Sequence, residues 1–476
     1  MLTLLVVVPA IVGVIALYSK DLRVDLALLV GTASAHLLVT ASLWIGESGP
    51  ELDALLTLDT LGLLVLSITS VIFLIAALYT IPYVLHGTHD KPVALQRFIP
   101  CLLWFLSAMS LVSVTQHLAL LWAAVEGTTL ASAPLVYFYR RRGALEATWK
   151  YLLVCSVGIA LALLGTFFLG IAGAGSSKGA SDLTLSGLSR AAPYMARPWL
   201  KAAFVLALVG YGTKMGLAPL HTWLPDTHSE APSPVSALLS GALLNCAFLS
   251  ILRFYQVCVA SGDAEFARTL LLMLGMASLL LASAFMLRQR DYKRLFAYSS
   301  IENMGIMAVG VGLGGAASYG TLLHALNHSL CKAGLFLLAG NVLRSFGSTL
   351  AQEVRGVLQR LPATGILLLM LLLAIGGVPP FGPFWSEFLI FQSAMGAHVW
   401  LGVAFLSLLT VAFLGMAGVW LPMLSGGGNL QGPRARESWL SFLPPLALAS
   451  ATLAMGLYLP SFLAVALHRA AGLLGG

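Results

Sequence analysis

The chain has 476 residues and a net charge of +7, with 59% hydrophobic and only 9% charged side chains. Soluble domains carry roughly 25% charged residues, so this composition excludes a water-soluble fold and predicts an all-α integral membrane protein. The positive charge favours anionic lipid headgroups over nucleic acid as partners, because no basic stripe exists outside the loops.

Apolar runs of about 17 to 25 residues, the length that crosses the hydrocarbon core, recur along the whole chain. The first run has no basic residue before it and no small-residue cleavage site after it, which favours a retained helix over a signal peptide. The longest joint, Gly173 to Trp199, predicts a loop around Ser176, Ser177, Lys178 and Ser181. The runs predict about fourteen spanning helices, at 2–18, 24–46, 60–86, 97–115, 117–139, 148–172, 199–220, 233–257, 268–287, 294–314, 318–343, 363–395, 400–423 and 438–467.

Lysine and arginine are distributed unevenly between the two sets of loops. The odd-numbered loops hold 17 of them and the even-numbered loops hold five, four of which lie in the long sixth loop. Because cytoplasmic loops carry the excess of basic residues, both termini are predicted on the outer side of the membrane.

The seventh and twelfth predicted helices are interrupted in related ways, by Gly216-Leu217-Ala218-Pro219 and by Gly377-Val378-Pro379-Pro380. Each proline removes a backbone donor, so Pro219, Pro379 and Pro380 break their helices at membrane depth. Breaks five helices apart predict two inverted five-helix repeats, helices 4–8 and 9–13. The predicted organisation is an N-terminal three-helix segment (1–96), two repeats (97–258 and 268–423) and a C-terminal helix (438–476).

Two opposite charges lie inside the first predicted repeat. Glu126 is nearly four turns from the nearest basic cluster, and Lys214 lies five residues before Pro219. A charge at the bilayer centre costs about 2.5–3.5 kcal/mol on insertion scales, so each of these residues is expected to have a partner and a functional role. The sequence predicts an ion pair between them, with a purely structural pair as the alternative.

In the eleventh predicted helix, His324, His328 and Lys332 recur every four residues and therefore share one face. Titratable groups in register through the bilayer are typical of a proton relay. Glu387 is the predicted end-point of this relay. Glu302 is either an uptake residue or the partner of a basic residue at the interface.

No metal site or cofactor is expected in this chain. The His324 and His328 pair lacks a third zinc ligand, and the five cysteines lie singly in apolar runs without C-x-x-C spacing. The loop from His221 to Pro232 contains Asp226, His228 and Glu230 but no lysine or arginine. It is read as a solvated acidic turn or, alternatively, as a mouth that gathers cations, with His221, Asp226 and His228 as uptake or relay candidates.

Several of these strings resemble the antiporter-like subunits of respiratory complex I. They are Thr213-Lys214 with Ala218-Pro219-Leu220-His221-Thr222-Trp223-Leu224-Pro225-Asp226, the run from Ala231 to Leu238, Leu323 to Ala333, and Gly377 to Phe381. The runs Ser299 to Gly305 and Leu239 to Asn245 look most like membrane subunits of hydrogenase-4 and formate-hydrogenlyase-type complexes. The resemblance implies a fourteen-helix fold with a translocating Glu and Lys in the cytoplasmic membrane of a bacterium or archaeon. It also implies other membrane subunits and a peripheral redox module of nickel–iron hydrogenase type as partners.

This sequence departs from that family in the eighth predicted helix, where a His or Lys is usual. Residues 235–250 offer only Ser240 and Asn245, so ordered waters at these two would carry the proton onward. The leading hypothesis is proton or sodium translocation driven by a redox partner, with no catalytic redox centre in this chain. The alternatives are a sodium/proton antiporter assembly, an inorganic-carbon uptake complex, and a non-conducting scaffold.

Overall fold

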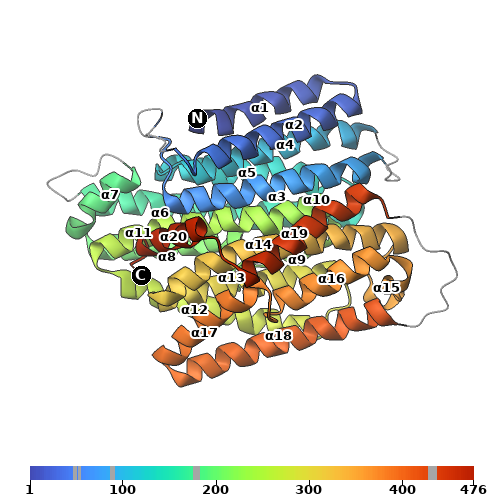
Figure 1. Cartoon of the computed structure of the whole chain (residues 1–476). Helices are drawn as coiled ribbons and strands as arrows, with labels where there is room; N and C mark the ends of the chain where they lie inside the picture. The colour runs from blue at the N-terminus through green and yellow to red at the C-terminus, as the bar shows by residue number, and fades with distance from the viewer. Residues whose placement is uncertain (47–50, 52–54, 86–91, 175–182, 427–436, 476) are drawn as a thin grey trace.

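The computed structural model describes residues 1–46, 51, 55–85, 92–174, 183–426 and 437–475. Within these ranges the protein is built from helices and contains only isolated β-bridges, which confirms the all-α prediction. The long helices run side by side along one direction, and both termini lie at the same end of the bundle (Figure 1).

The first six helices follow the predicted apolar runs closely. Their ends are set by caps and by polar joints; Asp21, for example, accepts a hydrogen bond from the backbone nitrogen of Arg23 at the start of the second helix. The helices are α1 (Leu2–Tyr18), α2 (Leu22–Ser42), α3 (Thr60–Leu85), α4 (Pro92–Val114), α5 (Leu118–Val136) and α6 (Arg142–Ala174).

The remaining helices include short pieces that the sequence did not separate. They are α7 (Leu185–Ala191), η1 (Ala192–Tyr194), α8 (Arg197–Met215), α9 (Trp223–Glu230), α10 (Ser233–Leu238), the π-turn η2 (Leu239–Leu243), α11 (Leu244–Ser261), α12 (Ala264–Met286), α13 (Tyr292–Leu313), α14 (Ala316–Phe346), η3 (Ala351–Glu353), α15 (Val357–Arg360), α16 (Pro362–Ile375), α17 (Gly382–Ala397), α18 (Val399–Ser425), α19 (Trp439–Leu457) and α20 (Ser461–Gly472). Ten helical stretches in the described ranges are long and apolar enough to cross a membrane. The count of fourteen and the segment boundaries stay predictions.

Two predicted elements were wrong in detail. The joint from Gly173 to Trp199 is not all loop, because Thr184 caps the short helix α7; its residues Ser176, Ser177, Lys178 and Ser181 lie outside the described residues. The last predicted helix is two helices, since α19 ends at Leu457 and α20 begins after Pro460. Proline has no backbone donor to continue a helix, which accounts for the division.

Both predicted helix breaks are present. Helix α8 ends at Met215, and the next residue, Gly216, has a φ of 84°, a left-handed conformation that favours glycine. Helix α16 ends at Ile375, Gly377 has a φ of 67°, and α17 begins only at Gly382. At each break, backbone N–H and C=O groups lack helical hydrogen bonds at membrane depth, so these groups need polar partners nearby.

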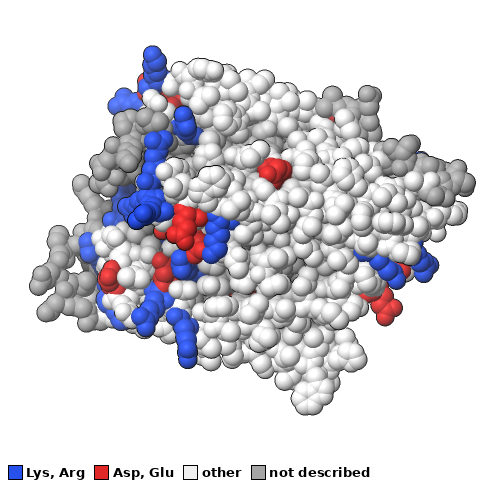
Figure 2. Space-filling view, turned by 180° about the vertical axis from the view of Figure 1, so that it is seen from behind, with Lys and Arg blue, Asp and Glu red and all other residues white. Residues whose placement is uncertain are grey.

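Charged side chains gather at the two ends of the molecule. Figure 2 shows a dense group of Lys, Arg, Asp and Glu at one end, fewer at the other, and between them a broad belt that is uncharged except for one acidic patch. This distribution is that of a membrane-spanning protein whose lipid-facing surface is apolar.

A buried ion pair ties the N-terminal helices to the helix after the π-turn. Arg253 of α11 is 0% exposed and donates to both carboxylate oxygens of Asp59, at 2.5 and 2.7 Å. Asp59 also accepts from the backbone nitrogen of Gly62 in the first turn of α3, at 2.9 Å. No pattern in the sequence indicates this pair, because Asp59 and Arg253 are far apart in the chain.

Breaking this pair from one side is expected to destabilise the protein by about 3–5 kcal/mol. Asp59→Asn keeps the contact to Gly62 but leaves the Arg253 guanidinium buried without its counter-charge. The double variant Asp59→Asn/Arg253→Met removes the stranded charge and should recover part of the loss. The unfolding midpoint is measured in detergent with a thiol-reactive dye that reports exposure of the five buried cysteines. A double variant less stable than the single one would contradict this account.

Candidate functional site

Lys214 lies at the centre of a hydrogen-bonded group contributed by three helices. Its ammonium is 0% exposed and donates to Thr129 Oγ1 of α5 at 2.9 Å and to the Tyr151 hydroxyl of α6 at 2.6 Å. The ammonium also lies over the Tyr151 ring, 4.6 Å from its centroid. Tyr151 in turn hydrogen-bonds Ser132 at 2.7 Å. Neutral oxygens, and no carboxylate, therefore form the immediate surroundings of the ammonium.

The predicted direct ion pair between Glu126 and Lys214 is wrong. Thr129 stands between them, accepting from Lys214 and donating to Glu126 Oε2 at 3.2 Å. The other carboxylate oxygen of Glu126 accepts from Ser156 Oγ at 3.1 Å. Glu126 and Thr129 are three residues apart on one face of α5, and this spacing allows the hydroxyl to bridge the two charges.

The stripe on α14 is fully buried, as predicted. His324, His328 and Lys332 are each 0% exposed. His324 is held on both ring nitrogens, by Ser386 of α17 and by Asn303 of α13, at 2.9 Å each. Lys332 donates to the backbone carbonyl of Phe296 in α13 at 3.1 Å. The stripe thus contacts α13 at His324 and at Lys332, and it reaches α17 at His324.

Two buried polar side chains of α14 have unmet hydrogen-bonding capacity. Both ring nitrogens of His328 and both amide atoms of Asn327 lack a partner among the described residues. The His328 ring approaches the backbone of Ser240 without completing a hydrogen bond. The Asn327 amide points to the start of α17, where it occupies the space that a side chain at Gly382 would need. Buried polar groups are seldom left unpaired, so these two are the natural positions for bound water.

The two carboxylates of the second half come from α13 and α17, which both pack against α14. Glu302 of α13 is 5% exposed and forms no ion pair in the described structure, which speaks against the alternative that it pairs with a basic residue at the interface. It lies within electrostatic reach of Lys332, and Glu387 lies within reach of Glu302. The Glu387 carboxylate folds back over Gly377 in the second helix break.

The eighth predicted helix, formed by α10, η2 and α11, separates the two groups of charges. Ser240 in its π-turn hydrogen-bonds Ser300 of α13 at 2.8 Å. Asn245 donates to Ser329 of α14 at 2.6 Å and to the carbonyl of Gly241 at 2.9 Å. The residue after Asn245, Cys246, lies within electrostatic reach of Lys214. This helix thus contacts the second group through Ser240 and Asn245, and it packs against α8, which carries Lys214.

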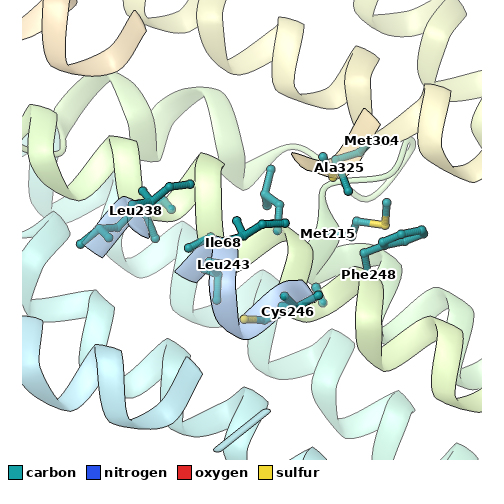
Figure 3. Packing of buried hydrophobic residues seen from close by; sticks show 14 of the residues in the cluster. Ile68, Met215, Leu238, Leu243, Cys246, Phe248, Met304 and Ala325 are labelled. Atoms are coloured by element: carbon teal, nitrogen blue, oxygen red, sulfur yellow. The ribbon is translucent and has the colours of Figure 1, made fainter. Parts of the chain in front are cut away.

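Apolar side chains fill the rest of the space around this helix. Figure 3 shows Leu243 and Cys246 along it, with Met304 and Ala325 packed across from it on α13 and α14. All of these side chains are buried. Ser240 and Asn245 are thus polar positions set among apolar side chains.

The segment from His221 to Pro232 is not the solvated acidic turn that the sequence indicated. Residues Trp223–Glu230 form α9, and Asp226 is neutralised by Lys150 at 2.5 Å and by Arg294 at 2.7 Å. His228 is 0% exposed, stacks on Phe336, and has no partner for either ring nitrogen among the described residues. Asp226 is thus not a free carboxylate that could gather cations, and His228 belongs to the buried interior.

Sequence reasoning missed the neutral residues that hold the charges in place. Hydroxyls and amides in apolar helices are the signal for them, but many such residues only bond their own helix backbone. Asn303, Asn327 and Ser329 were inside strings that resembled the family, yet no role was assigned to them. The missed contributors are Thr129, Ser132, Tyr151, Ser156, Asn303, Asn327, Ser329 and Ser386.

Within the described ranges, no group of three His, Cys, Asp or Glu side chains is placed to hold a metal ion. The expected absence of cofactors stays a prediction. What the site offers instead is a row of buried titratable and hydroxyl groups inside a helix bundle, and the fold with this row defines a multi-pass membrane protein of the antiporter-like class.

A family profile described as "NADH:quinone oxidoreductase/Mrp antiporter, TM" matches residues 115–413, and the chain belongs to this family. The hydrogenase-4 component F homolog of Methylacidiphilum infernorum is 37% identical over 409 residues, which cover 84% of this chain and 85% of that relative. Hydrogenase-4 component B of Escherichia coli is 30% identical over 354 residues, or 72% of this chain and 51% of that protein.

Solved structures show the same fold at lower sequence identity. A chain of the archaeal membrane-bound sulfane sulfur reductase superposes with a TM-score of 0.88 at 22% identity, covering 99% of this chain and 97% of that chain. A chain of the Mrp complex from Dietzia gives 0.87 at 19% identity, with the same coverage. A chain of respiratory complex I from Thermus thermophilus gives 0.84 at 23% identity, with complete coverage of both. All three belong to multi-subunit membrane complexes.

Proposed function

We propose that this chain moves protons or sodium ions across the membrane as one subunit of a redox-driven complex of the membrane-bound hydrogenase type. The observation that carries the proposal is the row of fully buried ionisable side chains, Lys214, His324, His328 and Lys332, in helices that are otherwise apolar. Such groups are costly to bury and serve ion movement far more often than stability.

The two halves of the row have separate tasks in this proposal. Glu126, Thr129 and Lys214 form the switching half, since a shift of the carboxylate relative to the bridging hydroxyl changes the field at the ammonium. The half made of His324, His328, Lys332, Glu302 and Glu387 forms the conducting half. Coupling between the two halves is electrostatic, and it requires no covalent step.

The crossing between the halves relies on water at the eighth helix. Asn245 Oδ1 and both nitrogens of His328 have no partner in the described structure, and a water at each position would satisfy them. Ser240 and Asn245 then take the place of the charged residue that the family usually has in this helix. His228, also unpartnered, would extend the same hydrated region toward α9.

The topology of the proposal follows the charge distribution. The Lys- and Arg-rich end of the molecule in Figure 2 is taken as the cytoplasmic end, which places both termini outside. Helices 4–8 and 9–13 are taken as inverted repeats, with their broken members at Gly216 and Gly377. The membrane is the cytoplasmic membrane of a bacterium or archaeon.

The partners follow from the relatives. Two of them carry hydrogenase-4 names, which favours a nickel–iron hydrogenase module as the source of energy and other membrane subunits as neighbours. Sodium/proton antiport and inorganic-carbon uptake remain the alternatives within ion transport. Genes for a nickel–iron hydrogenase, for small antiporter subunits, or for a carbonic-anhydrase-like partner beside this gene would separate the three.

A non-conducting scaffold is the second candidate, and the absence of a charge at positions 235–250 favours it. Glu126→Gln tests this candidate against translocation. The amide keeps the size of the side chain and can still bond Thr129 and Ser156, so a scaffold should tolerate the change. Loss of the negative charge near Lys214 should instead reduce pumping severalfold in vesicles that hold the assembled complex.

The matched control is Glu146→Gln, which makes the same substitution at an exposed position of α6. It should leave the ratio of ions moved per electron unchanged. Equal pumping by the Glu126 and Glu146 variants, at equal protein levels, would favour the scaffold.

A further inference from the structure

A groove of about 400 Å³ lies where the ends of α12 and α18 meet the loop after α14. Three arginines stand around its rim: Arg288 and Arg290, which follow α12, and Arg355, which follows η3. Its floor is formed by the last turns of α18, with Gly415, Gly418 and Val419 among the lining residues. None of the described residues that line the groove is acidic.

The three arginines are held close together by the backbone. Ala351 donates to the carbonyl of Arg290 at 2.8 Å, and Asp291 forms an antiparallel bridge with Leu350. These contacts join the loop after α12 to the loop after α14. The Arg355 side chain lies across the end of α18, where a side chain at Gly426 would collide with it. The rim is therefore built into the fold rather than assembled from free loops.

The guanidinium groups of Arg288, Arg290 and Arg355 form no ion pair or hydrogen bond in the part of the chain that the structure describes. At the same end, Lys150 and Arg294 are both matched to Asp226. Three unmatched like charges around one groove repel one another, and an anion placed between them removes that repulsion.

The floor of the groove is suited to a hydrocarbon chain. The side of α18 here is apolar, and a Cβ at Gly418 would meet nothing within 4 Å, so the glycine leaves open space along the helix. The arginines lie just beyond the ends of the spanning helices, at the depth of lipid headgroups, and the open floor continues from them into the apolar belt. Basic pockets of this form between spanning helices bind anionic phospholipids.

We infer that this groove is a binding site for one anionic phospholipid, whose phosphate lies among Arg288, Arg290 and Arg355 and whose acyl chain lies along α18 at Gly418. The charges of the rim select an anionic headgroup over a zwitterionic one. The acyl contact distinguishes a lipid from a soluble phosphate.

The test is native mass spectrometry of the purified full-length chain, titrated with phosphatidylglycerol, phosphatidylcholine and glycerol phosphate. We expect wild-type protein to retain phosphatidylglycerol in preference to phosphatidylcholine and not to retain glycerol phosphate. The triple variant Arg288→Gln/Arg290→Gln/Arg355→Gln should weaken phosphatidylglycerol binding by about tenfold or more. Gly418→Leu, whose Cβ enters open space, should weaken binding of both lipids and leave the arginines in place.

A matched control removes three exposed basic residues at the other cytoplasmic loops, Lys20→Gln/Arg23→Gln/Arg142→Gln, and changes the net charge equally. It should keep the preference for phosphatidylglycerol. Equal losses in the control and the groove variant, or no headgroup preference in the wild type, would overturn the inference. Retained lipid binding by the groove variant together with loss of a co-purified subunit would also overturn it, in favour of an acidic protein segment.

Discussion

Lys214→Met is expected to abolish ion translocation while the protein still inserts and assembles. Methionine fits the space of the lysine stem, so the packing of α8 against α6 and α11 is kept. What is lost is the cation that Thr129 and Tyr151 hold 0% exposed inside the bundle. Pumping is measured in inside-out vesicles by quenching of a pH-sensitive dye, and the amount of assembled complex is measured in the same membranes.

Lys201→Met is the matched control for this variant. It lies on the same helix, but at the exposed end, where the ammonium is 3.4 Å from Asp263. A surface pair of this kind contributes little, so translocation should be unchanged. Full pumping by the Lys214 variant at normal protein level would remove Lys214 from the mechanism.

The second large effect is expected on α14. Lys332→Met and His328→Ala should each reduce translocation to background, because a relay fails when any one of its members is missing. The double variant should then be no worse than either single variant, as found for groups that act as a unit. Rates of ion uptake in the same vesicles decide this, together with the partner's electron transfer measured in the presence of an uncoupler.

Arg344→Met provides the control on α14, since Arg344 is an exposed basic residue at the end of that helix. It should pump normally. Partial losses in the two single variants that add up in the double variant would show two independent structural effects, and the relay on α14 would have to be abandoned.

The sequence predicted the parts of this protein that depend on periodicity and on proline chemistry. The all-α membrane fold, the breaks at Gly216 and Gly377, and the common burial of His324, His328 and Lys332 all follow from spacing along one helix or from residues that end helices. These features are local, so a single sequence carries the information for them.

Features that depend on packing between helices far apart in the chain could not be predicted from the sequence. Thr129 comes between Glu126 and Lys214 because of how α5, α6 and α8 approach one another, and no spacing reports that approach. For the same reason Asp226 was read as solvated, although Lys150 and Arg294 reach it from other helices. The division of the last helix was a different kind of error, because Pro460 was visible in the sequence and could have been used.

The most direct test of the central claim is ion flux through the complete complex, purified through this chain and reconstituted in liposomes. With the electron donor of its partner supplied, the wild-type complex is expected to acidify one compartment, or to accumulate sodium when protons are short-circuited by an uncoupler. The variant Lys214→Met/Lys332→Met is expected to transfer electrons without either gradient. A gradient of normal size in that variant would show that ions cross the membrane elsewhere and would contradict the account.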